Sequence, residues 1–513
     1  MTQSTIAATL KEGFSKDFLA SIVVFLVALP LCLGIAIASG MPPTAGIVTG
    51  IVGGIIVGSL AGAPLTVSGP AAGLVVLVAE ILAAYGAAMM AVILLLAGIL
   101  QMIAGALKLG VWFRAISPAV IHGMLAGIGI LIIGSQFHIM LDRTPLANGI
   151  QNLMDIPNAL FETLAHHGGN LSAAFVGILT IGTIILWTRF APQRLKMIPG
   201  ALVGVLLAIL AANLLNLDVK FLAEMFDEPA TLSNLFDFSI PSIDHIADSL
   251  NGGVILAIVS LAFIASTESL LSVTAVDKMH QGPRAKYDKE LFAQGIGNSI
   301  CGMLGALPMT GVIVRSSANV QAGAVSRKST IMHGTWLLIF VGFFLFTLHY
   351  IPVATLAAVL VYTGYKLAYP KVAKELLAYG KAELAIYIIT LVTIVSFDLL
   401  TGVVTGLALS LLKLIYIFAH VVIKTDKHPS ENEVTMHLKG SATFVGLPKL
   451  ATALEEIEPG KTVNVQFDDL EYIDHACIEL LDNWQKQYVM TGGNAHIHWD
   501  SLMSKYHQQN NRS

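Results

Sequence analysis

Long runs of apolar residues fill most of the chain between Phe18 and His420. A helix needs about 20 residues to cross the roughly 30 Å hydrocarbon layer of a bilayer. Runs near this length predict membrane helices at residues 17–39, 43–62, 87–107, 117–140, 171–188, 198–216, 252–276, 290–306, 330–349, 351–367, 383–399 and 401–423.

Two further apolar segments are interrupted. One follows Ala63-Pro64-Leu65-Thr66-Val67-Ser68-Gly69-Pro70, and the other follows Met309-Thr310-Gly311-Val312-Ile313-Val314-Arg315. The pattern predicts that each begins as a short extended piece and then becomes a short helix. With these two, we expect about fourteen membrane elements in an all-α membrane domain.

The C-terminal part of the chain has a different pattern. β-Branched residues and alternation predict strands at Val434–Phe444, Thr462–Phe467 and Ala495–Trp499. Helices are predicted at Leu447–Ile457 and His475–Tyr488, the first ending at a Pro-Gly pair. Strands that alternate with helices indicate a small α/β domain.

Composition agrees with this division. Of the 513 residues, 55% are hydrophobic and only 12% are charged, with a mean hydropathy of +0.75, whereas soluble proteins carry about 25% charged residues. Charges are sparse up to His420 and dense from Lys424 onward. We therefore expect a transmembrane domain at residues 1–425 and a second domain at 430–513. The net charge of −4 does not favour nucleic-acid binding.

The loop charges predict an orientation. Cytoplasmic loops of membrane proteins are enriched in Lys and Arg. If the N-terminus is cytoplasmic, the predicted outer loops hold only Arg143 and Lys220. We therefore expect a multi-pass protein of the inner (plasma) membrane with both termini in the cytoplasm. The inner loops then contain Lys108, Arg114, Arg189, Arg194, Lys196, Lys278, Arg284, Lys286, Lys289, Arg327, Lys328, Lys366, Lys371, Lys374 and Lys381.

The interrupted segments are the main indication of function. Paired short segments broken by Gly or Pro in corresponding halves of a transporter point to a substrate site near the bilayer midplane. Ser68–Gly73 lies in the first half and Arg315–Asn319 in the second. Two helix N-termini that face each other present free N–H groups and positive dipole ends, which favour an anion. The alternative is two kinks in ordinary helices.

Two charged residues lie within predicted membrane segments, where a charge usually marks a transport pathway. Arg315 precedes the second short helix and would add a positive charge to the site. Glu268 lies within the apolar run Ile255–Val276. Burial disfavours the charged carboxylate, which suits proton transport, while Glu268 and Ser272 together would offer oxygen ligands to sodium. A structural ion pair between Arg315 and Glu268 is the alternative.

Other polar residues give no pattern of their own. The cysteines Cys32, Cys301 and Cys477 are far apart, and the histidines of the tail fit no closed zinc motif. His122 and His333 are interpreted as structural. We expect no resident metal, no cofactor and, because no nucleophile–base arrangement occurs, no enzyme activity.

Taken together, several motifs resemble the SulP (sulfate permease) family of anion transporters with a C-terminal STAS domain, over nearly the whole chain. The resemblance implies two inverted repeats of seven membrane segments, a core domain that moves against a gate domain like an elevator, and a homodimer. The motifs are Ala28-Leu29-Pro30-Leu31, Ser68-Gly69-Pro70, Glu268-Ser269-Leu270-Leu271-Ser272, Gln294-Gly295-Ile296-Gly297-Asn298, and Thr310-Gly311 through Arg315 to Asn319.

The resemblance also implies a ligand set. The coupling ion would bind at Glu268 and Ser272. The anion would bind at Ser68, Gly69, Pro70, Ala71, Ala72, Arg315, Ser316 and Ser317.

Details place the chain nearer one branch of that family. Leu31 follows the first-helix proline where many sulfate carriers have Gln, which is similar to the bacterial bicarbonate-type branch. That branch often has Asp where this chain has Glu268. In the tail, Asp474 is followed by His475 instead of the phosphorylatable Ser of soluble STAS regulators, so we expect the tail to support dimerisation and to dock a cytoplasmic partner.

The leading hypothesis is a secondary transporter of a small inorganic anion, bicarbonate or sulfate, coupled to sodium or protons. Two alternatives from other classes are a membrane receptor that signals through the STAS domain and a passive, chloride-like anion conductor. A nucleobase permease of the same fold is less favoured, since an arginine beside helix N-termini suits an anion better than a neutral ring.

Overall fold

A computed structural model divides the chain into two compact units, Met1–Gly406 (the helical unit) and Leu407–Ser513 (the C-terminal unit). The division falls inside the last long helix. The structure describes residues 3–110, 117–146, 149–165, 169–192, 195, 198–225, 251–418, 421–427, 432–467, 470–500 and 502–503.

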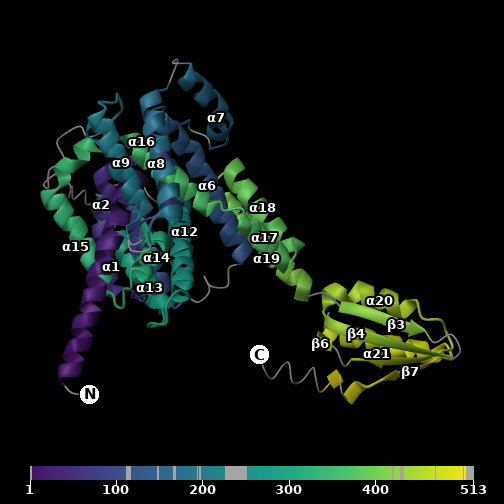
Figure 1. Ribbon diagram of the computed structural model, residues 1–513. Helices are drawn as coiled ribbons and strands as arrows, with labels where there is room; N and C mark the ends of the chain where they lie inside the picture. The colour runs from purple at the N-terminus through teal and green to yellow at the C-terminus, as the bar shows by residue number, and fades with distance from the viewer. Residues whose placement is uncertain are drawn as a thin grey trace. The chain divides into compact units, whose positions relative to one another are not determined.

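The helical unit consists of helices joined by short connections (Figure 1). Shorter 3-10 or π turns are η1 (Val52–Val57), η2 (Ala72–Leu74), η3 (Leu222–Met225) and η4 (Leu345–Tyr350). The α-helices, the last of which continues into the C-terminal unit, are α1 (Gln3–Ala38), α2 (Pro43–Ile51), α3 (Gly58–Leu60), α4 (Val75–Ala106), α6 (Pro118–Met140), α7 (Gly149–Leu164), α8 (Leu171–Phe190), α9 (Gly200–Leu214), α12 (Gly252–Asp277), α13 (Tyr287–Met303), α14 (Ile313–Gln321), α15 (Lys328–Phe343), α16 (Val353–Leu367), α17 (Lys371–Tyr379), α18 (Lys381–Ser396) and α19 (Leu399–Phe418).

Seven helices of the described part of the chain are long and apolar enough to cross a bilayer. The shorter helices α9, α13, α15, α16 and α18 occupy other positions where spans are predicted. Helix α4 turns at Gly86, whose φ of 77° divides it where a separate span is predicted to begin. The count of fourteen spans and their inverted repeat remain predictions. Helix α7 lies between the predicted spans 117–140 and 171–188, and residues 226–250 lie outside the described part of the chain.

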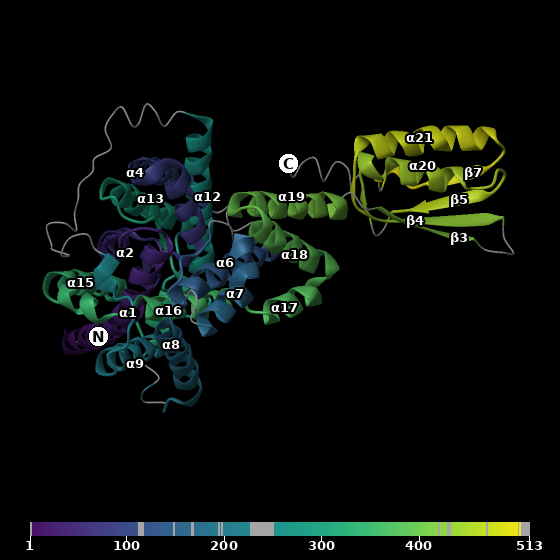
Figure 2. The ribbon, with the colours of Figure 1, turned by 90° about the horizontal axis from the view of Figure 1, so that it is seen from above.

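The helices pack in two groups. In one, α4 packs against α12 and α13, while α1 packs against α2, α14 and α15. In the other, α6 packs against α7, α16 and α18, and α8 packs against α9 and α16. Figure 2 shows α4, α12 and α13 side by side. The division into core and gate domains stays a prediction, because α1 also packs against α9 and α16.

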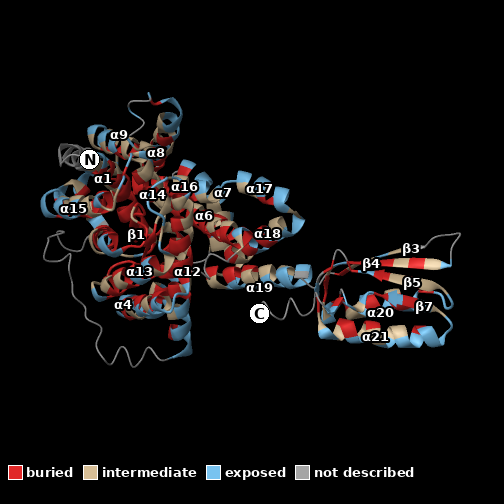
Figure 3. Cartoon of the chain, turned by 90° about the horizontal axis from the view of Figure 1, so that it is seen from below, coloured by how far each residue is buried: buried red, intermediate tan, exposed pale blue. Residues whose placement is uncertain are grey.

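The centre of the helical unit is buried, whereas its outer helices expose apolar side chains. Buried residues gather around β1 and α14 (Figure 3). Outer helices such as α8 and α9 instead expose large apolar side chains, among them Phe175, Ile178, Leu206 and Leu210. Exposed apolar surface of this extent is costly in water and is what a lipid-facing helix presents.

Small residues allow α4 and α13 to approach closely. A Cβ atom added to Gly98 would lie 2.5 Å from the Ser299 backbone nitrogen, and one added to Gly295 would lie 2.6 Å from the Gly98 oxygen. Close packing through small residues is a main source of helix association in membranes, where lipid removes the hydrophobic drive. This contact orders α13, which carries residues of the central site.

The C-terminal unit is a five-stranded sheet with two helices, α20 (Leu447–Glu455) and α21 (His475–Met490). β4 pairs antiparallel with β3 and parallel with β5 and β6, and β5 pairs parallel with β7. Alternate β4 residues, including Val434, Met436 and Leu438, enter the core. The strands are β3 (Val421–Lys427), β4 (Glu433–Ala442), β5 (Thr462–Gln466), β6 (Leu470–Ile473) and β7 (Asn494–Ile497).

This unit has the predicted α/β class, with two strands more than predicted. The predicted strands and helices correspond to β4, β5, β7, α20 and α21. β6 is only four residues long, and β3 begins at Val421, within the residues assigned to the membrane domain. The reason is that only His420 separates the apolar residues 421–423 from the apolar run of α19.

The close α4–α13 contact predicts that a larger residue at Gly295 lowers the stability of the protein. We expect Gly295→Val to lower the stability of the detergent-solubilised protein by about 1–3 kcal/mol, because added methyl groups overpack the contact. The measurement is the thermal melting temperature, followed by size-exclusion chromatography. Gly182→Val on α8 is the matched control, since a Cβ atom there meets nothing within 4 Å. Equal melting temperatures for the two variants would contradict the prediction.

Candidate functional site

The two interrupted segments meet as a short antiparallel sheet. β1 (Ser68–Pro70) pairs with β2 (Met309–Gly311), with Gly69 opposite Thr310. The Val312 N–H extends the pairing by donating to the Val67 oxygen at 2.9 Å. Pro70 has no N–H to leave unpaired, and Gly69 lets β1 lie directly against the Arg315 side chain, which a Cβ atom there would overlap. β1 continues into η2 and α4, and β2 continues into α14, so both helices start beside this sheet.

Helix α13 satisfies further polar groups of the sheet. Gln294 donates to the Ser68 hydroxyl at 2.7 Å and to the buried Glu290 carboxylate at 2.9 Å. Asn298 brackets Met309, accepting from its N–H at 2.7 Å and donating to its oxygen at 3.1 Å. Each such bond matters because an unpaired backbone group away from water costs free energy.

Arg315 is buried inside this arrangement, with no exposed surface. Its Nη2 donates to the Pro70 oxygen at 3.4 Å. Its Nε and Nη1 have no hydrogen-bond partner among the described residues. A buried guanidinium with free donors is costly unless a charge or an acceptor meets it, so the group is suited to a bound anion.

Glu268 reaches the start of the other helix from α12. Its carboxyl group lies against Gly73 and hydrogen-bonds with the Gly73 backbone, and a Cβ atom at Gly73 would lie 2.6 Å from Oε2. Oε2 itself has no hydrogen-bond partner in the described part of the chain. Glu268 and Arg315 therefore do not form the ion pair considered as an alternative; Arg315 contacts Pro70 and Glu268 contacts Gly73 at the start of the first short helix.

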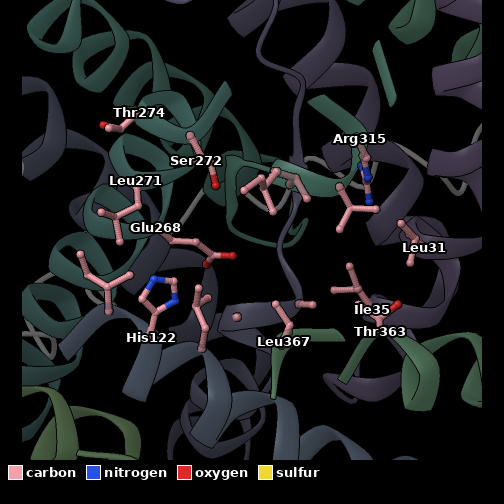
Figure 4. A pocket seen from close by; sticks show the side chains of 18 of the residues that line it. Leu31, Ile35, His122, Glu268, Leu271, Ser272, Thr274, Arg315, Thr363 and Leu367 are labelled. Carbon is pink, nitrogen blue, oxygen red and sulfur yellow. The ribbon is translucent and has the colours of Figure 1, made fainter. Parts of the chain in front are cut away.

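A cavity of about 480 Å³ lies between these groups. Figure 4 shows Glu268 and Ser272 from α12, His122 from α6, and Arg315 on another side of the space. Its α12 wall runs from Glu268 to Lys278, about 15 Å at 1.5 Å per residue, so the cavity extends to the helix end that carries the predicted cytoplasmic loop. The rest of its wall is mostly apolar, including Leu31, Ile35, Ile121, Leu271 and Leu367.

The predicted ligands fall into two sets. Ala72, Arg315, Glu268 and Ser272 line the cavity. The other six, which lie behind its wall, are Ser68, Gly69, Pro70, Ala71, Ser316 and Ser317.

The hydroxyl groups of that second set have structural partners. The Ser316 hydroxyl accepts from the Val67 N–H at 2.8 Å and donates to the Val312 oxygen. The Ser317 hydroxyl donates to the Val314 oxygen at 3.0 Å. These groups join α14 to β1 and close its first turn, so they shape the site from behind.

Most of the residues that line the cavity were absent from the predicted ligand set, and three of them bear on its chemistry. Gly73 stands in the interrupted motif itself, and its lack of a side chain is what admits the Glu268 carboxyl. His122 was interpreted as structural and Lys278 as a loop residue, yet both line the cavity. Their only sequence signal was a polar residue within one or two turns of a predicted helix end.

The groups that line the cavity are few and of different kinds. The described residues include no group of three or more His, Cys, Asp or Glu that could hold a metal ion. What the cavity presents is a guanidinium, two helix starts and a carboxyl group. These are elements that recognise a small anion and one positive ion.

Comparisons with known proteins agree with this chemistry. The profile of the sulfate permease family matches residues 14–390. A candidate sulfate transporter of Bacillus subtilis, YvdB, is 28% identical over 92% of this chain and 89% of its own length. The bicarbonate transporter BicA of a Picosynechococcus cyanobacterium is 25% identical over 76% of this chain and 68% of its own.

The fold is also that of a solved anion transporter. The structure of murine Slc26a9 in the inward-facing state matches 96% of this chain and 87% of its own length, with a TM-score of 0.76 and 15% identity. That match covers both units, and at this identity it concerns the fold alone. Because the family profile covers most of the chain, the protein belongs to the sulfate permease family of membrane anion transporters, and it is not an enzyme.

Proposed function

We propose that this protein is a secondary active transporter of a small inorganic anion, bicarbonate or sulfate, which binds in the cavity between Arg315 and the two helix starts. The observation that carries the proposal is the buried Arg315 guanidinium, whose Nε and Nη1 lack partners beside a cavity. The site is electrostatically incomplete without an anion. The similarity to YvdB and BicA supports these two substrates.

Glu268 is the proposed coupling residue. Its carboxyl group lines the same cavity and has an oxygen without a partner. A proton on that oxygen, or a sodium ion held with Ser272, would neutralise it. Ser272 lies one helical turn away on α12, on the face that lines the cavity, which is the spacing that two ligands of one ion need.

Transport would follow from movement between the two helix groups. The group that contains α4, α12, α13 and α14 holds the site, and α6 and α16 of the other group close the cavity from the opposite side. In the proposed elevator motion, the first group carries the anion along the second. The proposal includes the predicted homodimer and a plasma-membrane location with cytoplasmic termini. It also gives the C-terminal unit the role of a STAS domain that docks a cytoplasmic partner.

The main experiment is an uptake panel in proteoliposomes with radiolabelled bicarbonate, sulfate and a dicarboxylate. A secondary transporter accumulates its substrate against a gradient when a sodium or proton gradient is imposed. A passive conductor would give large currents without accumulation, and a receptor would bind the anion without flux. Either result would overturn the proposed function.

Arg315 gives the sharpest prediction for the anion site. We expect Arg315→Gln to reduce anion affinity at least about 30-fold, because removing one partner of a buried charged contact costs roughly 2–5 kcal/mol. Substrate dependence of uptake gives this number. Arg284→Gln is the control, since that side chain is 70% exposed and lies outside the cavity. Unchanged anion affinity in a well-folded Arg315→Gln protein would contradict the proposed anion site beside Arg315.

Glu268 gives a separate prediction for coupling. We expect Glu268→Gln to retain anion exchange but to lose the response of uptake to the imposed gradient, because the amide has the carboxyl shape without its charge. The comparison is uptake with and without the gradient. Glu224→Gln is the control, as Glu224 is exposed on η3 and does not line the cavity. A variant that still responds to the gradient would place coupling elsewhere.

A further inference from the structure

The C-terminal unit exposes two large apolar side chains directly after β4. Phe444 is 70% exposed and Val445 is 52% exposed, in the short turn η5 (Phe444–Gly446) that connects β4 to α20. We call this pair the β4–α20 tip. An exposed Phe-Val pair at the end of a folded domain has no role in the core of that domain, since the core cluster of the unit does not include it.

The tip follows the C-terminal end of β4, which lies beside the start of β3, the first strand after α19. β3 starts at Val421, which pairs with Gly440 near the end of β4. α19 ends at Phe418, and three residues span at most about 11 Å. The edge that bears the tip is therefore tethered close to the point where α19 leaves the bilayer.

A surface hollow joins the tip to α19 itself. It has a volume of about 320 Å³ and is lined by Leu412, Ile415 and Tyr416 of α19 together with Val445 and Lys449. The Lys449 Nζ donates to the Val421 oxygen at 2.8 Å and so ties α20 to the start of β3. The exposed apolar surface of α19 thus continues without a break into the β4–α20 tip.

Two hydrogen bonds to one side chain stiffen the turn that carries the tip. Asp474, at the start of α21, accepts a hydrogen bond from the Phe444 N–H and one from the Cys477 N–H at 2.9 Å. The backbone of Phe444 is therefore fixed to the neighbouring helix start. The Phe444 side chain is exposed while its backbone is held in place. This arrangement is suited to insertion of the side chain into an apolar environment.

We propose that the β4–α20 tip inserts into the interfacial layer of the bilayer beside α19. The partner is a lipid surface, because Val445 of the tip lines the same hollow as exposed apolar side chains of α19, a helix long and apolar enough to cross a bilayer. Lysines flank the tip in the chain, at Lys439 and Lys449, and lysines near a membrane surface are attracted to anionic headgroups. This contact is independent of the proposed transport function, and it would limit the motion of the C-terminal unit.

The experiment places an environment-sensitive fluorophore on the full-length protein in liposomes, at Val445→Cys. The native cysteines Cys32, Cys301 and Cys477 are buried, and burial together with the neighbouring Asp474 raises the pKa of the Cys477 thiol to about 12, so labelling is selective. Lipids brominated in the upper acyl chain serve as the quencher. The matched control is Met490→Cys, which is 86% exposed at the last residue of α21.

We expect brominated lipids to reduce emission from position 445 but not from position 490. Adding Phe444→Ser to the Val445→Cys protein should lessen that loss, because one of the two inserting side chains is removed from an exposed site without disturbing the core. Emission unaffected by bromine at both positions would overturn the proposal by placing the tip in water. A blue-shifted but unquenched signal at 445 would also overturn it, since it would place the tip against protein, such as a second copy of the chain.

Discussion

The pairing of β1 with β2 is the constraint on which the site depends. Inside a bilayer, extended backbone is tolerated only where other protein groups satisfy its donors and acceptors. Here each short strand satisfies the other, Asn298 of α13 bonds the Met309 backbone, and Ser269 of α12 accepts from the Gly311 N–H. Each interrupted helix alone would leave backbone groups unpaired inside the membrane. Paired as β1 and β2, the two segments form one unit that holds both helix starts beside each other.

That unit determines where the charges lie. Arg315 lies in the first turn of α14 and donates to the Pro70 oxygen of β1, so the guanidinium connects the two interrupted segments. Glu268 enters from α12 and contacts the other helix start through Gly73. The two opposite charges thereby contact different residues of the segment that starts α4, and they are not paired with each other. A direct ion pair would have satisfied both groups and left nothing for an anion to bind.

The sequence predicted this arrangement in outline because its signals are strong and local. Interrupted apolar runs are rare, and a guanidinium and a carboxyl group within membrane segments are conspicuous, so Arg315 and Glu268 could be identified without a structure. The directions of side chains could not. Ser68 and Ser316 have the same residue type as a ligand would, but only the packing of α13 and β1 shows that their hydroxyls bond to protein groups. β3 was missed because its apolar residues extend those of α19.

The position of Glu268 explains why anion binding and a positive ion would be linked at this site. An ionised carboxylate at the start of α4 already takes up the positive end of that helix, as a bound anion would. A second negative charge in the same poorly hydrated cavity is repelled by several kcal/mol even at an effective dielectric constant near 20. If a proton or sodium ion neutralises Glu268, that repulsion disappears and the helix start becomes available to the substrate. Under the proposed function, coupling is therefore a consequence of placing a carboxyl group at the same helix end that serves the anion, and it needs no separate mechanism.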